Sequence, residues 1–236
     1  MSAILQTRGL QKIFTQGSVD VKALAGVDFA SQAGEFTALI GPSGSGKTTL
    51  LNLIGVLDQP TAGDVTVQGE NTVHLTRAAA AEFRLHKIGF VFQAYNLVPV
   101  LTAFENAEYT LLLQGVDKAE RRRIIQPLFE RVGIAKSMYE RRPHELSGGQ
   151  QQRVAVVRAI ASKPAVVLAD EPTANLDSVT SEHLLDLMVE LNRESGVTFI
   201  FASHDDMVTE RARRVVHMRD GRIEHDEIRE SPQATG

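Results

Sequence analysis

The chain has 236 residues, of which 43% are apolar and 23% charged, and its formal net charge at pH 7 is −4. Enough apolar residues are present for a proper core, whereas the acidic balance argues against a dedicated nucleic-acid binder, which usually carries a basic excess. The absence of cysteine excludes disulfides, thiolate catalysis and thiolate metal sites. No signal-peptide pattern opens the sequence, and its apolar runs fall far short of the ~20 residues that span a bilayer. Any membrane role is therefore expected to act through a partner.

The first part of the sequence alternates between strand patterns and helix patterns. Residues 2–31 are expected to form short strands with turns at Gly17-Ser18 and Gly26. A compact apolar strand over Phe36–Ile40 runs directly into a glycine-rich loop. The elements expected after this loop are a helix over Thr48–Leu57, a strand over Asp64–Gln68, a helix over Ala78–His86 and a strand over Ile88–Phe92.

The stretch from Leu101 to about Ser162 has a mostly helical pattern and is expected to form a lobe inserted at roughly residues 94–162. Beyond it, strand and helix patterns alternate again, which predicts a mainly parallel α/β sheet. The expected elements are helices over Thr102–Gln114 and Lys118–Val132, a helix that begins at a second glycine turn, a strand over Ala165–Ala169, a helix over Val179–Glu194 and strands over Val197–Ala202, Arg214–Met218 and Arg222–His225.

The glycine-rich loop reads GPSGSGKT and lies between a predicted strand and a predicted helix. In that setting, successive backbone N–H groups point at phosphate oxygens, and glycine permits the unusual dihedrals and the close approach. Lys47 is expected to neutralise the β and γ phosphates, and Thr48 to offer its hydroxyl to Mg²⁺. The predicted phosphate-binding residues are Gly41, Ser43, Gly44, Ser45, Gly46, Lys47, Thr48 and Thr49.

Acidic, amide and imidazole side chains follow three other predicted strands. Asp170 and Glu171 end the strand that starts at Ala165, where Asp170 is suited to hold the metal and Glu171 to polarise a water for attack on the γ-phosphate. Gln93 is placed to ligate metal or orient water, and His204 to donate a hydrogen bond to the transferring phosphate. Taken singly, such residues are more often strand ends, solvated loop residues and structural histidines, so their weight comes from the phosphate loop beside them.

A second glycine turn, Leu146-Ser147-Gly148-Gly149-Gln150, opens a predicted helix about a hundred residues after the first. Helix N-termini attract anions because their free N–H groups and the helix dipole point outward. An ordinary helix cap by Ser147 explains the local pattern equally well. Residues 147–150 therefore have two interpretations, an anion site and a cap.

Together, GPSGSGKT, Gln93, LSGGQ, VVLADE, the segment 174–177 (ANLD) and His204 resemble the ATP-binding cassette ATPases over about residues 3–226. The resemblance implies a P-loop NTPase of α/β class with an N-terminal antiparallel β subdomain and an inserted helical lobe, followed by a polar tail over 227–236. It also implies that two copies dimerise head to tail, each ATP lying between one copy's phosphate loop and the other's LSGGQ turn.

Residue roles follow from the same resemblance. Glu171 is expected to be the catalytic base and His204 the residue that senses the γ-phosphate, while Asp177 communicates between sites. Phe14 is expected to stack on adenine, although a core position in the first strand is the alternative. The implied nucleotide is ATP, contacted also by Gln93, Ser147, Gly148, Gly149 and Gln150, with Mg²⁺ held by Thr48, Gln93 and Asp170.

The flanking segments narrow the resemblance to the lipoprotein-release (LolD) and macrolide-exporter (MacB) cassettes, with the cell-division cassette FtsE a near neighbour. Such cassettes work with membrane permeases that carry large extracytoplasmic domains, which implies a peripheral protein at the cytoplasmic face of the inner membrane. The groove that receives the permease is expected at Tyr95, Leu97, Val98, Pro99 and Leu101, which are otherwise lobe core. The rival interpretations are a soluble cassette ATPase that acts on nucleic acid or the ribosome, an FtsE-like regulator, and a scaffold without hydrolysis.

Overall fold

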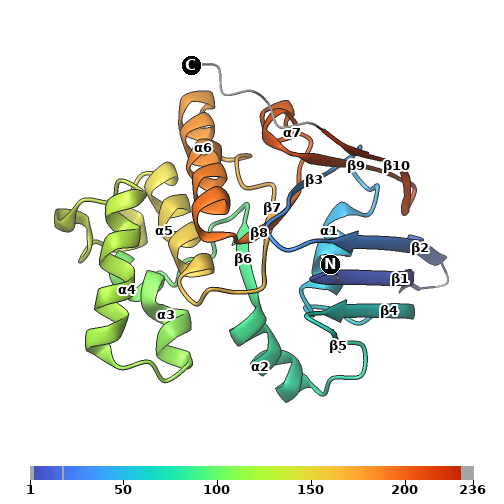
Figure 1. The fold of residues 1–236 in the computed structure, drawn as a ribbon, viewed down its shortest axis with the longest axis horizontal. Helices are drawn as coiled ribbons and strands as arrows, with labels where there is room; N and C mark the ends of the chain where they lie inside the picture. Colours follow the sequence, from blue (N-terminus) through green and yellow to red (C-terminus); the bar gives the residue numbers. More distant parts are fainter. Residues whose placement is uncertain (1–2, 18, 230–236) are drawn as a thin grey trace.

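The computed structural model describes residues 3–17 and 19–229 and contains two β-sheets (Figure 1). The first is an antiparallel sheet of four strands in the order β2-β1-β4-β5. Its strands are β1 (Leu5–Gln16), β2 (Val19–Ser31), β4 (Ala62–Val67) and β5 (Glu70–Asn71). This sheet confirms the expected N-terminal antiparallel subdomain. Its two long strands replace the short pieces predicted for residues 2–31, because the interruptions at Gly9 and Gly26 bend the pairing without ending it.

The second sheet has six strands in the order β10-β9-β3-β8-β7-β6. Its parallel members are β3 (Phe36–Ile40), β6 (Ile88–Phe92), β7 (Val166–Asp170), β8 (Thr198–Ala202) and β9 (Arg214–Arg219), and β10 (Arg222–Ile228) pairs antiparallel with β9. The mainly parallel sheet predicted from the alternation of elements is therefore present. The start of the predicted tail, residue 227, falls inside β10, and residues 230–236 lie outside the described part of the chain.

The helices fall into groups around the six-stranded sheet. Figure 1 shows α3, α4 and α5 together on one side of this sheet, with the antiparallel sheet on the opposite side. The helices are α1 (Lys47–Ile54), α2 (Arg77–Lys87), α3 (Ala103–Leu113), α4 (Lys118–Arg131), α5 (Gly148–Ile160), α6 (Ser178–Ser195) and α7 (Asp206–Arg211), with short 3₁₀ turns at Lys136–Met138 and Pro143–Glu145. Among the described residues, none of these helices has the length and apolar character needed to cross a membrane.

A hydrophobic core lies on each face of the six-stranded sheet, because successive side chains of a strand point to opposite faces. In β8, Phe199 and Phe201 join the core shared with α5, α6 and the helical lobe, whereas Ile200 and Ala202 join the core beneath the antiparallel sheet and α1. Burial on both faces explains why these strands are continuous apolar runs in the sequence. It also fixes the strand ends rigidly, and the candidate site is built on those ends.

Candidate functional site

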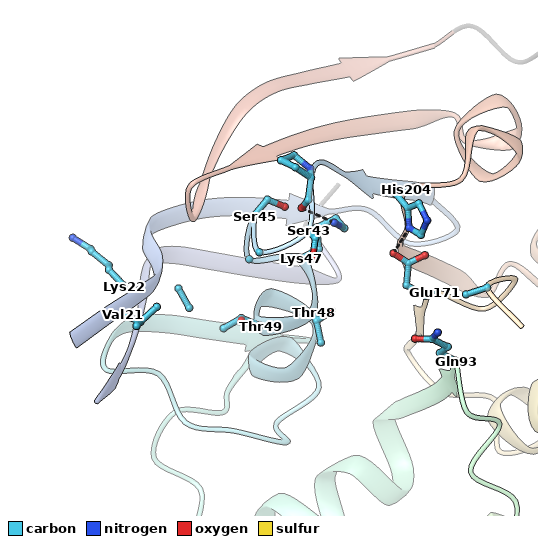
Figure 2. Close-up of a pocket in the computed structure, with 15 residues that line it drawn as sticks. Val21, Lys22, Ser43, Ser45, Lys47, Thr48, Thr49, Gln93, Glu171 and His204 are labelled. Carbon is cyan, nitrogen blue, oxygen red and sulfur yellow. Dashed lines mark hydrogen bonds and ion pairs between the residues drawn. The ribbon is translucent and has the colours of Figure 1, made fainter. Parts of the chain in front are cut away.

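Four segments of the site begin where neighbouring parallel strands end. Ile40, Phe92, Asp170 and Ala202 are the last residues of β3, β6, β7 and β8. The carboxyl ends of parallel strands share one edge of the sheet, so the residues that follow them meet there. A cavity of about 820 Å³ opens at this edge, and Figure 2 shows its side chains. It is lined by Val21, Lys22, Ala23, residues 42–49, Gln93, Glu171, Ala174 and His204.

The phosphate loop follows β3 and has a backbone that side chains would obstruct. Gly41, Gly44 and Gly46 have φ values of 150°, 80° and 102°, a region that other residues rarely adopt. A Cβ at Gly41 would collide with the carbonyl oxygen of Met218, and one at Gly46 would lie 2.7 Å from the Ala23 carbonyl oxygen. Gly41 and Gly46 are therefore required by both dihedral and space, and Gly44 by its dihedral alone.

Lys47 opens α1 and is folded back over its own loop. Its ammonium group donates hydrogen bonds to the carbonyl oxygens of Gly41 at 2.7 Å and Pro42 at 3.1 Å, and the residue is only 7% exposed. The charge is thus held at the centre of the loop, beside the N-terminus of α1. This combination of a buried cation with helix N–H groups is suited to binding phosphate.

The turn between β9 and β10 supports the phosphate loop through backbone contacts. Gly221 donates its backbone N–H to the Ser45 carbonyl at 3.1 Å and accepts from the Ala25 N–H at 2.8 Å. Gly221 has a φ of 71°, and a Cβ there would lie 2.6 Å from the Ala23 carbonyl oxygen. These contacts join backbone atoms of two distant segments. No side-chain pattern in the local sequence therefore predicts them.

Thr48 and Asp170 come together from α1 and the end of β7. The Thr48 hydroxyl donates to the Asp170 carboxylate at 3.0 Å. Burial raises the pKa of Asp170 above its ordinary value, while the Thr48 hydrogen bond and the charge of Lys47 act in the opposite direction. A partly buried carboxylate that is disfavoured in its charged form gains from a cation, so this pair fits a divalent metal.

The oxygen donors at this edge match Mg²⁺ in kind. Thr48 and Asp170 supply a hydroxyl and a carboxylate, and the Gln93 amide faces the same cavity (Figure 2). Such hard oxygen ligands suit Mg²⁺, which usually keeps waters and shares its coordination with substrate phosphates. Within residues 3–17 and 19–229, no group of three or more histidine or acidic side chains forms a metal cage by itself.

Glu171 is held in a strained conformation by the end of β8. Its φ is 46°, and its N–H donates to the Ala202 carbonyl at 2.9 Å. One carboxylate oxygen lies 2.8 Å from Nδ1 of His204, and the other accepts from the Ser203 hydroxyl at 3.2 Å. Figure 2 shows the His204 and Glu171 side chains turned toward each other above Gln93. The structure thus brings together the acid and the histidine that the sequence singled out.

The second glycine turn lies outside the cavity. Ser147 caps α5: its hydroxyl accepts from the Gln150 N–H at 3.3 Å, and the Ser147 N–H donates to the Gln150 side-chain oxygen at 2.9 Å. The cap interpretation therefore applies in this chain. The cavity lining includes none of residues 147–150, so the anion interpretation requires a ligand held by another molecule.

Asp177 likewise caps a helix, because it accepts hydrogen bonds from the N–H and the hydroxyl of Thr180 at the start of α6. These bonds lower the pKa of Asp177 below its ordinary range. Asp177 lies outside the lining of the cavity as well.

Phe14 lies on β1 opposite Val21. Phe14 is 40% exposed, so it does not belong to the hydrophobic core. Side chains of directly opposed residues point to the same face of a sheet, and Val21 lines the cavity. The Lys12 ammonium lies 4.9 Å from the centre of the Phe14 ring. An exposed ring on the same face as a residue of the cavity lining is suited to stacking on a nucleobase.

A second cavity, of about 320 Å³, lies between α2, β6 and α3. Leu57, Phe90 and Phe92 contribute apolar surface, and Leu57 is 45% exposed. Of the residues predicted for a docking groove, Leu97 packs against the core of the helical lobe instead, and the Tyr95 hydroxyl donates to the Asn175 carbonyl. This second cavity lies beside the segment predicted for the groove, and Asn96 is its one lining residue from the range 95–101.

Comparison with known proteins places this geometry in context. The family model described as "ABC transporter" matches residues 24–174. An uncharacterized ABC transporter ATP-binding protein of Thermotoga maritima is 45% identical over 229 residues, which is 97% of each chain. The lipoprotein-releasing system ATP-binding protein LolD 1 of Rhodopseudomonas palustris is 44% identical. The matched region spans 94% of this chain and 99% of that protein.

Two further matches define the length and the assembly of the relatives. The macrolide export ATP-binding/permease protein MacB of Syntrophobacter fumaroxidans is 44% identical over 94% of this chain, which spans 31% of that longer protein. Among solved structures, the dimeric post-hydrolysis state of the ATP-binding cassette MJ0796 bound to ADP and Pi, a protein of Methanocaldococcus jannaschii, has a TM-score of 0.89. It is 38% identical and covers 97% of this chain and 100% of its own.

Proposed function

This chain belongs to the ABC transporter family as an ATP-hydrolysing subunit of the LolD and MacB type, and we propose that two copies close head to tail around two ATP molecules to drive a membrane permease. The observation that carries the proposal is the position of the second glycine turn. Residues 147–150 form a partly exposed helix start that does not line the chain's own cavity. A head-to-tail partner would bring that helix start over the phosphates bound by the other copy.

The phosphate loop and Phe14 provide the ATP-binding half of the site. Lys47 would exchange its carbonyl contacts for the β and γ phosphates, and the glycine N–H groups would bind the remaining oxygens. Thr48, Gln93 and Asp170 would hold Mg²⁺, which neutralises phosphate charge when bound. Phe14 would stack on the adenine ring.

Glu171 is the proposed general base. Its two carboxylate oxygens contact His204 and Ser203, and each oxygen keeps a further lone pair that would accept a proton from the attacking water. His204 is mostly exposed and would turn its ring toward the γ-phosphate as it leaves Glu171. Asp177 would communicate with the partner copy through the start of α6.

The substitution Glu171→Gln tests the assignment of the base. Glutamine keeps the size and the hydrogen bond from Ser203 but accepts no proton, so turnover is expected to fall by about 10²–10⁴-fold. ATP affinity is expected to be retained and the dimer to persist with ATP bound, measured by phosphate release, nucleotide titration and size-exclusion chromatography. Glu82→Gln, on the exposed face of α2, is the matched control. Turnover in Glu171→Gln close to that of Glu82→Gln would refute the role.

A permease is the second proposed partner. LolD 1 is named as part of a lipoprotein-releasing system, and MacB carries an ATP-binding part and a permease in one protein. The cavity lined by Leu57, Phe90 and Phe92 offers apolar surface where a permease segment would dock. We propose a permease with a large extracytoplasmic domain, which places the cassette peripherally at the cytoplasmic face of the inner membrane.

The substitution Leu57→Asp tests the docking surface. A carboxylate would have to be desolvated when the cavity is covered, so the share of tagged chain that sediments with native membranes is expected to fall. The ATPase rate of the purified chain is expected to stay unchanged, since Leu57 is outside the ATP cavity. Ile228→Asp, at an 83% exposed position on β10, should leave sedimentation intact. Equal sedimentation of both variants would argue against docking at this cavity.

A further inference from the structure

The loop that follows β6 is tied to two other parts of the site by contacts that the roles above do not use. Tyr95 and Asn96 both have positive φ values, 59° and 48°. Two consecutive non-glycine residues in the left-handed region cost conformational energy, which the surrounding structure must offset. The stabilising contacts come from α5 and from the segment before α6.

Arg158 of α5 holds the backbone of this loop. Its guanidinium donates to the Tyr95 carbonyl at 2.9 Å and to the Asn96 carbonyl at 2.6 Å. Burial lowers the pKa of Arg158. The helix α5, which begins at the second glycine turn, is therefore hydrogen-bonded to the loop that carries Gln93. Any movement of one is transmitted to the other through this charged, directional contact.

Two hydrogen bonds of opposite direction join the same loop to the segment before α6. The Tyr95 hydroxyl donates to the Asn175 carbonyl at 3.3 Å, and the Asn175 amide donates to the Gln93 carbonyl at 2.9 Å. Asn175 stands two residues before Asp177, which caps α6. The position of Gln93 and the position of Asp177 are thus linked through Tyr95 and Asn175.

The Tyr95 ring also covers the start of α5. A Cβ at Gly148 would lie 2.8 Å from the Tyr95 hydroxyl oxygen and 3.7 Å from the nearest ring carbon, so a side chain at this position would displace the tyrosine. Behind it, the Gln152 amide donates to the Pro172 carbonyl at 2.7 Å and lies within 3.4 Å of the Phe92 carbonyl oxygen. One tyrosine side chain therefore touches the second glycine turn and the 172–177 segment while belonging to the loop of Gln93.

We propose that Tyr95 is a positioning residue that couples the two ATP sites of the dimer by linking Gln93, which faces the chain's own ATP, to Gly148 and Asp177, which face the partner's ATP. This inference rests on the proposed head-to-tail function. When ATP and metal draw Gln93 inward, the Gln93 carbonyl moves and carries Asn175 with it. Tyr95 shifts over Gly148 at the same time, so the half-site offered to the partner is adjusted before the partner's ATP is hydrolysed.

The substitution Tyr95→Phe removes the hydroxyl but keeps the ring over Gly148. Loss of one neutral hydrogen bond is expected to weaken the coupling by about two- to tenfold. In steady-state ATP hydrolysis by the purified chain, the Hill coefficient should fall toward ~1 from a wild-type value of ~2, which equals the number of sites in the dimer. The rate at saturating ATP should change by less than about twofold, because Tyr95 touches none of the reacting groups. A purely structural defect would lower this rate and leave the Hill coefficient unchanged.

Asn175→Asp supplies an independent test of the same link. It replaces the amide donor by a carboxylate that repels the Gln93 carbonyl, so it should also lower the Hill coefficient. Because both bonds join the same two segments, the double variant should lose less coupling than the sum of the single losses. Tyr139→Phe is the control for the chemical change, since its buried hydroxyl has no hydrogen-bond partner among the described residues.

The outcomes separate this inference from the proposed function. A wild-type chain that neither hydrolyses ATP nor dimerises would overturn both. Cooperative wild-type hydrolysis with an unchanged Hill coefficient in Tyr95→Phe and Asn175→Asp would overturn the coupling role of Tyr95 and leave the dimeric ATPase intact. Wild-type hydrolysis with a Hill coefficient of ~1 would also overturn it, because no coupling would then exist to be carried.

Discussion

Individual side chains of the site are already engaged within the protein. Lys47 is bonded to two loop carbonyls, Glu171 to His204 and Ser203, and Ser147 and Asp177 each cap a helix. In the proposed reaction, Lys47 would exchange its loop carbonyls for phosphate oxygens, and His204 would leave Glu171 for the γ-phosphate. Such exchanges would cost little, because the groups stay close to where they are needed and keep their polar atoms satisfied in both states.

The ion pair between Arg214 and Asp226 gives a residue-scale prediction for stability. Arg214 donates to both oxygens of Asp226, at 2.9 and 2.7 Å, and the hydrogen bond from Arg214 is the main reason that the pKa of Asp226 is lowered. Asp226 is partly exposed, so Asp226→Asn is expected to reduce the free energy of unfolding by only about 1 kcal/mol at pH 7. The measurement is urea unfolding.

The pH dependence of this effect has a definite sign. A carboxyl group with a lowered pKa in the folded state stabilises the fold above its unfolded pKa of about 3.9, and this contribution is lost as the pH falls through the folded value. The difference between wild type and Asp226→Asn should thus be constant from pH 7 to about 5 and shrink at lower pH. Glu224→Gln, in an exposed pair at 4.0 Å, should show little difference throughout. A gap that widens on acidification would contradict this assignment.

At the scale of elements, the phosphate loop depends on a hairpin far from it in the sequence. The turn between β9 and β10 supplies the N–H of Gly221 to Ser45, and Met218 on β9 leaves no room for a side chain at Gly41. The strand β3 that leads into the loop is flanked by β8 and β9. The loop geometry is therefore a property of three elements together.

Gly221→Ala tests the support of the loop by this turn. The added Cβ would lie 2.6 Å from the Ala23 carbonyl oxygen, so the turn and the loop must shift, and nucleotide affinity is expected to fall roughly ten- to hundredfold. Gly196→Ala is a matched control: its φ of 67° resembles the 71° of Gly221, but no atom lies within 4 Å of its added Cβ. It should lose about 1–2 kcal/mol of stability with unchanged affinity. Equal affinities, measured by nucleotide titration, would exclude the proposed support.

The sequence predicts best the features that a local pattern encodes. The bounds predicted for β3 and β6 match the structure, and those of β7 and β8 agree to within one residue, because burial on both faces gives each strand an unbroken apolar run. Site residues that follow such strands are predicted for the same reason. Gly221, Arg158 and the Tyr95–Asn175 bond escape prediction because they act on backbone carbonyls or amides of distant segments, which have no side-chain signature.

At the scale of the whole molecule, mixing two inactive variants tests the head-to-tail dimer. Lys47→Ala disables the phosphate loop, whereas Ser147→Asp keeps a good helix cap and repels phosphate. In a mixed dimer, both defects fall in one site and the other site is intact. If equal amounts exchange subunits freely, about a quarter of the wild-type sites are restored. Steady-state ATPase activity measures this fraction, and each variant alone is the control. No recovery on mixing would mean that each site lies within one chain.

The placement of β3 between β8 and β9 also determines when the phosphate loop is completed during synthesis. Both neighbours of β3 are made more than 150 residues after it, and the turn that supports Ser45 comes later still, at Gly221. Pairing over such separations is slow and cannot begin until the distant strands exist. A growing chain that has emerged only as far as the helical lobe thus carries every residue of the loop without its native geometry. The competence to bind ATP therefore arises only after β8, β9 and the turn at Gly221 have been made.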